Sequence, residues 1–245
     1  MSPIQPLRAS SRLADTPKEP QYSVPVTRAD GESLLAADPK LTRALLALMD
    51  MQAVLGGAAS HWGGPSALAE LMSALHALAF DEATRKGRSW HELFHLINDA
   101  GHCENGLYAL KANYGFAGLR IQDLKGFRSI DSVLTGHGES HLFPEGVLLS
   151  NGPLGSSLPQ AQGLCFADRL ANNHRVTVTT ISDGACMEGE AKESLAAIPG
   201  LAHQGRLNPF VLIISDNHTK LTGRMSDAFD MRPTFEALGD LGWDL

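Results

Sequence analysis

The sequence predicts an α/β fold with parallel strands, because a strand, a helix and a second strand follow one another in its last third. Residues Val176–Ser182 are rich in β-branched side chains, as is typical of a strand, and the run stops at Asp183-Gly184. A helix-like segment then reaches Ala197, and a second apolar run covers Phe210–Ser215. Connections of this kind make neighbouring strands parallel, so both should end at the same edge of the sheet.

Polar residues follow both predicted strands at that edge. Asp183 ends the first strand and Asn217 follows the second. Open α/β sheets bind ligands at their carboxyl edge, and Mg²⁺ is usually held by one or two protein oxygens together with phosphate oxygens. Asp183, Asn217 and a backbone carbonyl just beyond Asn217 would supply half of an octahedral shell. The alternative is that both are ordinary loop residues.

The segment from Ser182 to Asn217 resembles the thiamine diphosphate motif of the transketolase family, which begins Gly-Asp-Gly and ends in Asn about thirty residues later. Here Asp183 and Asn217 are 34 residues apart (217 − 183 = 34). Ser182 replaces the first glycine of the motif. Extra residues between Pro199 and Pro209 are expected to lengthen the loop from helix to strand.

The composition is that of a folded protein without a nucleic-acid-binding surface. The 245 residues are 43% hydrophobic and 19% charged, with a formal net charge of −7 and no basic stripe. No apolar run approaches the roughly 20 residues of a membrane span, and no signal peptide is recognisable, so we expect a cytoplasmic protein. The cysteines, Cys103, Cys165 and Cys186, show no CxxC spacing and are expected to be buried thiols.

The first part of the chain predicts an arm followed by two helices. Residues 1–39 are rich in proline and lack sustained periodicity, so we expect an extended arm, with a disordered tail favoured over a structured strap that binds a partner. Apolar residues at helical spacing predict a helix over 41–54. After a loop around His61, Ser66 is expected to cap a helix over 67–80.

The run from His91 to His95 reads His-Glu-Leu-Phe-His and matches the HExxH motif of zinc peptidases. That motif needs a helix, so that both imidazoles share one face and bind zinc. Gly87 shortly before and Gly101 soon after leave room for only a short helix. The resemblance to the transketolase family instead implies a short strand over 93–98, and a zinc peptidase is the alternative of another class.

Further helices are predicted over 106–114 and 122–127. The run Ser-Asn-Gly-Pro-Leu-Gly-Ser-Ser over 150–157 is expected to open a helix that reaches Ala171, with Pro153 near its first turn.

The resemblance to the transketolase family extends over 41–245 and implies a doubly wound, mostly parallel sheet flanked by helices. Three histidines lie at the family's positions in loops that glycines border or flank, namely His61, His102 and His137. The resemblance implies that His61 and His137 orient the substrate and are the candidate catalytic residues, whereas His102 contacts the diphosphate of the cofactor.

The resemblance also implies the cofactors, thiamine diphosphate and Mg²⁺. The residues expected to bind the cofactor are His102, Gly152, Pro153, Leu154, Asp183, Gly184 and Asn217. The expected metal ligands are Asp183, Asn217 and the carbonyl of Thr219. Glu188 matches an interface glutamate of the family and is expected to face a partner chain.

We therefore predict an arm over 1–39 and a thiamine diphosphate-binding domain over 40–245, without the pyrimidine-binding and C-terminal domains that follow in the family. The predicted function is one half of a transketolase-like enzyme that transfers a two-carbon ketol unit between sugars. It would be inactive without a partner that carries the pyrimidine-binding domain, and an oligomer is expected. Whether the chain is a natural subunit or a truncated product stays open.

Two further alternatives concern the function. The first is the E1 component of a 2-oxo-acid dehydrogenase, because the residues at 221–223 and 241–243 would suit that branch as well. The expected substrate is therefore either a sugar phosphate or a 2-oxo acid. The second is a subunit that binds the cofactor without catalysis.

Overall fold

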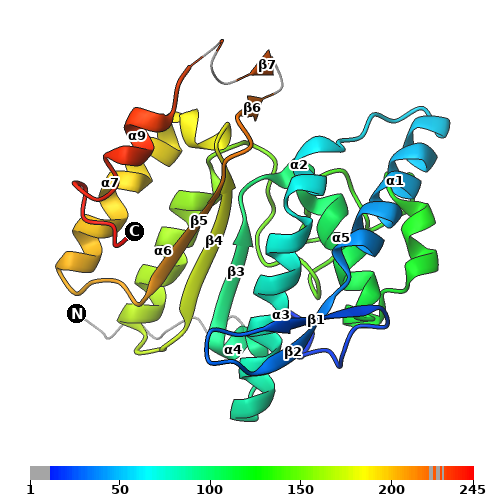
Figure 1. Ribbon diagram of the computed structural model, residues 1–245, viewed down its shortest axis with the longest axis horizontal. Coiled ribbons are helices and arrows are strands. Elements are labelled where there is room, and N and C mark those ends of the chain that lie inside the picture. The colour runs from blue at the N-terminus through cyan, green and yellow to red at the C-terminus, as the bar shows by residue number, and fades with distance from the viewer. Residues whose placement is uncertain (1–11, 221–222, 225–226, 228) are drawn as a thin grey trace, which may run out of the picture.

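The computed structural model describes residues 12–220, 223–224, 227 and 229–245. At its centre lies a parallel sheet in the order β3-β4-β5 (Figure 1). The strands are β3 (Phe94–Asn98), β4 (Val176–Ser182) and β5 (Phe210–Ser215). Thr179 of β4 lies in register with Ile97 on one side and Leu212 on the other. The predicted parallel strands are confirmed, and their carboxyl ends share one edge.

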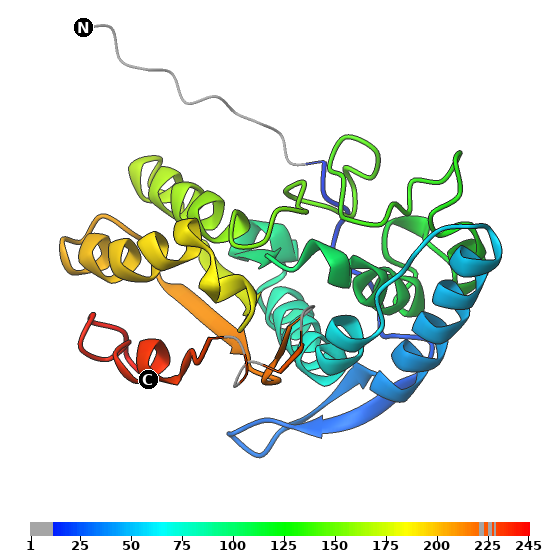
Figure 2. The same cartoon turned by 90° about the horizontal axis from the view of Figure 1, so that it is seen from above.

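Helices flank this sheet, as predicted (Figure 2). On one face, α6 (Ser157–Leu170) and α7 (Gly189–His203) pack on β4 and β5, and Ile181 shares a core with Leu158 and Leu195. On the other face lies α3 (Ala69–Lys86), whose Leu75 belongs to the same apolar cluster as Leu96 of β3. Because side chains alternate along a strand, one short sheet supports two cores.

A helical layer beside α3 completes the fold. It contains α1 (Pro39–Leu55), α2 (Gly63–Ala67) and α5 (Glu104–Asn113), and every residue of α5 is buried. The side chain of Asp38 accepts a hydrogen bond from the N–H of Lys40 at 2.8 Å and so caps α1. Near the carboxyl edge project the short strands β6 (Thr219–Lys220) and β7 (Gly223–Arg224), and α9 (Arg232–Glu236) lies against α7. In the part of the chain that the structure describes, no helix is long and apolar enough to cross a membrane.

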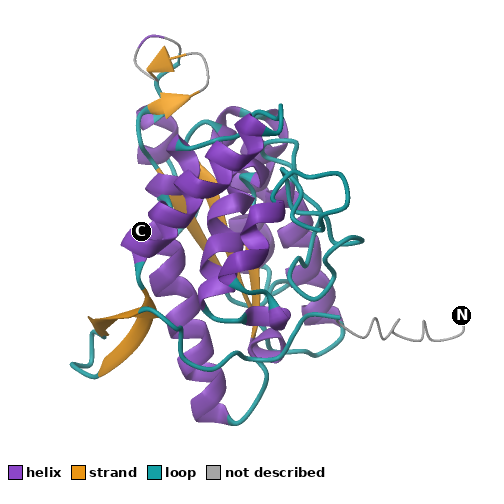
Figure 3. Ribbon diagram, turned by 90° about the vertical axis from the view of Figure 1, so that its right-hand side faces the viewer, coloured by secondary structure: helices purple, strands orange, loops and turns teal. Residues whose placement is uncertain are grey.

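The N-terminal region departs from the predicted disordered tail. β1 (Ser23–Thr27) and β2 (Ser33–Ala37) form an antiparallel hairpin, seen at the lower left of Figure 3. Its turn contains Asp30-Gly31, a strong hairpin signal, and Gly31 has a φ of 85°. The hairpin is anchored because Ser73 of α3 donates a hydrogen bond to the carbonyl of Ala37. Residues 1–11 of the predicted arm lie outside the described residues.

The HExxH run is divided between two elements and does not form a zinc site. His91 lies in the single turn α4 (Trp90–Leu93), whereas His95 lies in β3. His95 Nε2 is 2.8 Å from the buried carboxylate of Asp168. Among the described residues no cluster of three His, Cys, Asp or Glu could hold a metal ion. The strand predicted over 93–98 is therefore confirmed at 94–98.

Several local predictions need correction. Ser66 does not cap the second helix, because it lies inside α2 and the cap position of α3 is Leu68. Pro153 lies in the turn before α6 rather than in its first turn. The residues around Pro199 do not lengthen the loop that follows the helix. They lengthen α7 itself, which continues through this proline to His203.

Two other predictions need little change. The helix predicted over 122–127 is a 3₁₀-helix over Ile121–Gly126. The three cysteines are buried and free, as predicted.

Candidate functional site

The three predicted histidines come from separate loops and line one cavity of about 610 Å³ at the carboxyl edge of the sheet. His61 precedes α2, His102 lies in the 3₁₀-helix Gly101–Cys103 after β3, and His137 belongs to the long loop before α6. The rings of His61 and His102 have centroids 5.0 Å apart. The structure thus brings together residues that are up to 76 positions apart in the sequence (137 − 61 = 76).

Two of these imidazoles, those of the half-buried His102 and His137, favour the neutral form. The pKa of His102 is lowered to about 4, first by burial and then by the neighbouring His61 and His137. Burial also lowers the pKa of His137, and the guanidinium of Arg128 adds to this effect. A neutral imidazole can donate one hydrogen bond and accept another, which suits recognition of hydroxyl, carbonyl or phosphoryl oxygens.

Asp183 provides an unpaired carboxylate oxygen at the end of β4. The residue is 1% exposed, and its Oδ1 accepts a hydrogen bond from the N–H of Gly184 at 2.9 Å. Its Oδ2 is buried and has no hydrogen-bond partner among the described residues. Burial raises the pKa of Asp183, and the neighbouring carboxyl group of Asp216 raises it further. A buried oxygen without a partner is costly, so this site favours a cation.

Asn217 and Thr219 line the same cavity as Asp183, so the structure brings the three predicted metal ligands to one place. In this structure Asn217 Oδ1 accepts a hydrogen bond from the N–H of Thr219 at 2.9 Å. A carboxylate, an amide oxygen and a nearby backbone carbonyl are the donors that a hard cation prefers. The donor set therefore fits Mg²⁺.

The serine that replaces the first glycine of the motif is accommodated. Ser182 Oγ accepts a hydrogen bond from the N–H of Ala185 at 3.1 Å, which holds the turn after β4. The departure from the family pattern thus strengthens the turn without removing a ligand.

Glycines bring backbone close to the cavity. Gly152, Leu154 and Gly184 line it, whereas Pro153 is exposed and lies outside the lining. At Gly64 a Cβ atom would lie 2.9 Å from His102 Nε2 and 2.8 Å from the sulfur of Cys103. This space exists only because glycine has no side chain.

Two residues that sequence reasoning missed, the buried Asp99 and the half-buried Asn151, hold the loops of the site together. Asp99 accepts hydrogen bonds from the N–H groups of Gly155 at 2.7 Å and Ser157 at 2.8 Å. Asn151 accepts one from the N–H of Gly138 at 2.7 Å. Asp99 stands directly after β3, as Asp183 stands after β4, so the same signal, a carboxylate where a strand stops, could have identified it.

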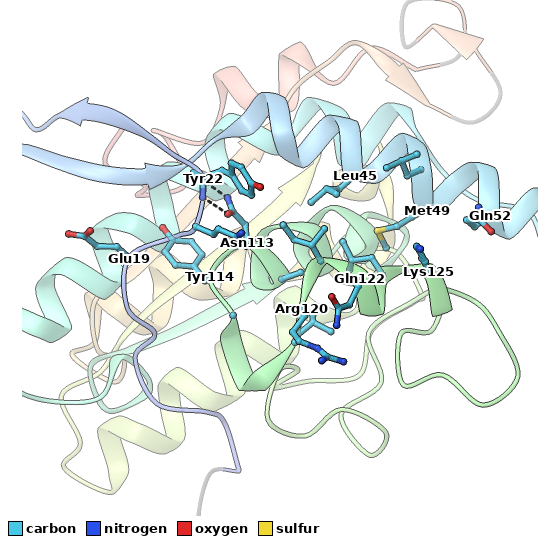
Figure 4. A pocket seen from close by; sticks show the side chains of 17 residues that line it. Glu19, Tyr22, Leu45, Met49, Gln52, Asn113, Tyr114, Arg120, Gln122 and Lys125 are labelled. Atoms are coloured by element: carbon cyan, nitrogen blue, oxygen red, sulfur yellow. Dashed lines mark hydrogen bonds between the residues drawn. The ribbon is translucent and has the colours of Figure 1, made fainter.

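A second, larger cavity of about 780 Å³ lies between α1, α5 and the chain before β1 (Figure 4). Its lining includes Leu45, Met49, Asn113 and Lys125. None of the predicted site residues belongs to it. The chemistry therefore gathers in the smaller cavity at the sheet edge.

Comparison with known proteins gives a family for this arrangement. Residues 40–245 match the profile described as "Transketolase, thiamine diphosphate binding domain". The chain belongs to the transketolase family. This match covers the sheet, its helices and every candidate site residue.

Transketolases are also among its relatives in sequence. The transketolase of Rhodobacter capsulatus is 30% identical over 219 residues, which are 84% of this chain and 30% of that protein. The transketolase of Aquifex aeolicus is 32% identical over 166 residues, 63% of this chain and 23% of that protein. The chain thus spans less than a third of these transketolases.

Solved structures of transketolases share the fold. The enzyme from Leishmania mexicana matches with a TM-score of 0.65 and 24% identity, covering 85% of this chain and 32% of that one. The enzyme from Campylobacter jejuni matches with a TM-score of 0.64 at the same identity, covering 83% and 32%. At this identity the likeness concerns the architecture of the transketolase domain.

Proposed function

We propose that this chain binds Mg²⁺ and thiamine diphosphate and provides one half of the active site of a transketolase-like enzyme. The observation that carries the proposal is the buried Oδ2 of Asp183, which has no hydrogen-bond partner among the described residues and lies in a cavity that three histidines also line. An unpaired carboxylate oxygen beside glycine-lined backbone is the combination that a metal diphosphate needs.

In this proposal the metal and the diphosphate have separate ligands. Asp183, Asn217 and the carbonyl of Thr219 would hold Mg²⁺. His102 and the backbone at Gly152, Leu154 and Gly184 would contact the diphosphate, since all of these line the cavity. Pro153 would act only by shaping the turn.

The remaining histidines would bind the substrate. When bound, thiamine diphosphate supplies the nucleophile and the electron sink for breaking a bond next to a carbonyl group. His61 and His137 would donate hydrogen bonds to hydroxyl and carbonyl oxygens of a sugar phosphate and fix its orientation. Three imidazoles line the cavity and its described lining contains no arginine, which favours a polyhydroxy substrate and thus ketol transfer.

The E1 component of a 2-oxo-acid dehydrogenase remains the second candidate within the class. Leu221 and Thr222, on which it partly rests, lie outside the described residues. A subunit that binds the cofactor without catalysis is the third candidate.

A complete active site requires groups beyond this domain. We propose that a pyrimidine-binding domain, carried by another polypeptide or by a further part of the same one, completes it in an oligomer. Glu188 is exposed at the start of α7, next to the turn at Gly155, which is consistent with a partner contact there. A cytoplasmic location stays a prediction.

The test is ketol transfer from a ketose phosphate to an aldose phosphate in the presence of Mg²⁺ and thiamine diphosphate. The 245-residue chain alone should show no turnover, because half a site loses the positioning that gives many powers of ten in rate. Adding a pyrimidine-domain partner should restore turnover, and Asp183→Ala should abolish it again. Turnover by the chain alone would refute the half-site proposal.

A further inference from the structure

We infer that Lys220 also binds phosphoryl oxygens in this cavity and that its ammonium group contacts the diphosphate of the cofactor. This inference rests on the proposed function, because it concerns the same cavity. It assigns a role to a residue that the family motif does not contain.

The position of Lys220 places it beside the metal end of the cavity. It occupies β6, directly after Thr219 and three residues after Asn217. Its half-buried side chain lines the cavity, and its Cβ lies 3.6 Å from the point where a Cβ on Gly184 would stand. Lys220 therefore lies next to the backbone of Gly184, directly after Asp183, at the same edge of the sheet.

The charges in the cavity favour a cationic side chain next to the proposed metal site. Of the described residues that line it, Lys220 is the only lysine or arginine, and Asp183 is the only carboxylate. Burial lowers the pKa of His102 and His137, so these imidazoles contribute little positive charge near neutral pH. A diphosphate together with the Asp183 carboxylate carries more negative charge than one Mg²⁺ neutralises, and the Lys220 ammonium group would offset the excess.

Lys220 is also available for such a contact. Within the described residues it forms no ion pair, whereas Lys111 pairs with Glu104 at 3.1 Å and Lys86 with Glu82 at 2.9 Å. An ammonium group that is half-buried and lacks a carboxylate partner gains most from an anionic ligand. The phosphate of a sugar substrate offers the same chemistry as the diphosphate. The diphosphate is favoured because Lys220 is adjacent to the proposed metal ligands.

The experiment is calorimetric titration of the 245-residue chain with inorganic diphosphate and Mg²⁺. Lys220→Gln should weaken binding roughly tenfold to a hundredfold, the loss expected for a charged hydrogen bond. Lys220→Arg should retain most of the affinity because it keeps the charge. Lys125→Gln, which removes an exposed lysine from the other cavity (Figure 4), should have no effect. A parallel titration with ribose 5-phosphate should be unchanged by Lys220→Gln.

The outcomes separate this inference from the proposed function. Equal diphosphate affinity in the wild type and Lys220→Gln, with Asp183→Asn still abolishing binding, would overturn the role of Lys220 alone. A loss confined to ribose 5-phosphate would also overturn it and assign the lysine to the substrate. Absence of diphosphate binding by the wild type, or full binding by Asp183→Asn, would refute the proposed function and the inference with it. Thermal unfolding midpoints equal to the wild type establish that both lysine variants are folded.

Discussion

The carboxylate of Asp99 accepts a hydrogen bond from the backbone N–H of Gly155 at 2.7 Å and so ties the end of β3 to the turn before α6. These residues are 56 positions apart, and both are buried. The bond fixes the glycine turn that lines the cavity relative to the strand that leads to His102. Burial raises the pKa of Asp99, and the hydrogen bonds from Gly155 and Ser157 oppose that shift.

We predict that Asp99→Ala destabilises the chain by at least about 1–3 kcal/mol, because two buried N–H groups lose their acceptor. Urea denaturation at pH 7 measures this free energy of unfolding. Asp131→Ala, at an exposed aspartate, is the matched control and should change it by less than about 0.5 kcal/mol. Equal stability of the two variants would show that Asp99 does not hold the turn.

Gly64→Ala should disturb the site more than the fold. The new methyl group would lie 2.9 Å from His102 Nε2, so the imidazole must move. We expect a weaker affinity for Mg²⁺ and thiamine diphosphate, together with a shifted NMR signal of the His102 ring. Gly63→Ala is the control, since no atom lies within 4 Å of its new Cβ. Identical ring signals in both variants would contradict the close approach.

The buried His76 should make the fold sensitive to acid. Burial lowers its pKa to about 4, and the charge of Lys111 adds to this effect although the carbonyl of Met72 opposes it. Because the folded state binds a proton less readily than the unfolded state, the stabilisation is complete above about pH 6.5 and is lost as the pH falls toward 4.

Between pH 7 and pH 5, His76 should therefore account for about 2 kcal/mol of lost unfolding free energy. Chemical denaturation of the wild type and His76→Leu at both pH values measures this contribution, and the variant should lose less on acidification. His174→Leu, at an exposed histidine, should behave like the wild type. If His76→Leu lost as much unfolding free energy between pH 7 and pH 5 as the wild type, His76 would not be the source of the acid sensitivity.

The strands and the site could be predicted from sequence where the signal is local. Val176–Ser182 is β-branched at every position except Ser182 and is followed by an aspartate, so both its conformation and its carboxyl end were predicted correctly. The strand in the HExxH run was predicted correctly as well, but from the family resemblance, because the flanking glycines argue only against a long helix. In the structure His95 pairs instead with Asp168, which is 73 positions away, and no local pattern indicates such a partner.

Other features were missed for physical reasons. The N-terminal hairpin was missed because the proline-rich composition favours an extended arm. The turn signal Asp30-Gly31 is stronger evidence than this composition. The extra residues between Pro199 and Pro209 are expected to lengthen a loop, but α7 continues through Pro199, which is buried inside the helix. Loop anchors such as Asn151 act through long-range hydrogen bonds, and these become visible only once the strands are placed side by side.

The central claim is that Asp183 holds the metal of a metal diphosphate at the carboxyl edge of the sheet. Calorimetry of thiamine diphosphate with Mg²⁺, on the chain together with the proposed pyrimidine-domain partner, tests it most directly. We predict measurable binding that requires the divalent ion and weakens sharply in Asp183→Ala and Asn217→Ala, because each change removes an oxygen ligand. Cofactor affinity that is unchanged in both variants, or independent of Mg²⁺, would contradict the account.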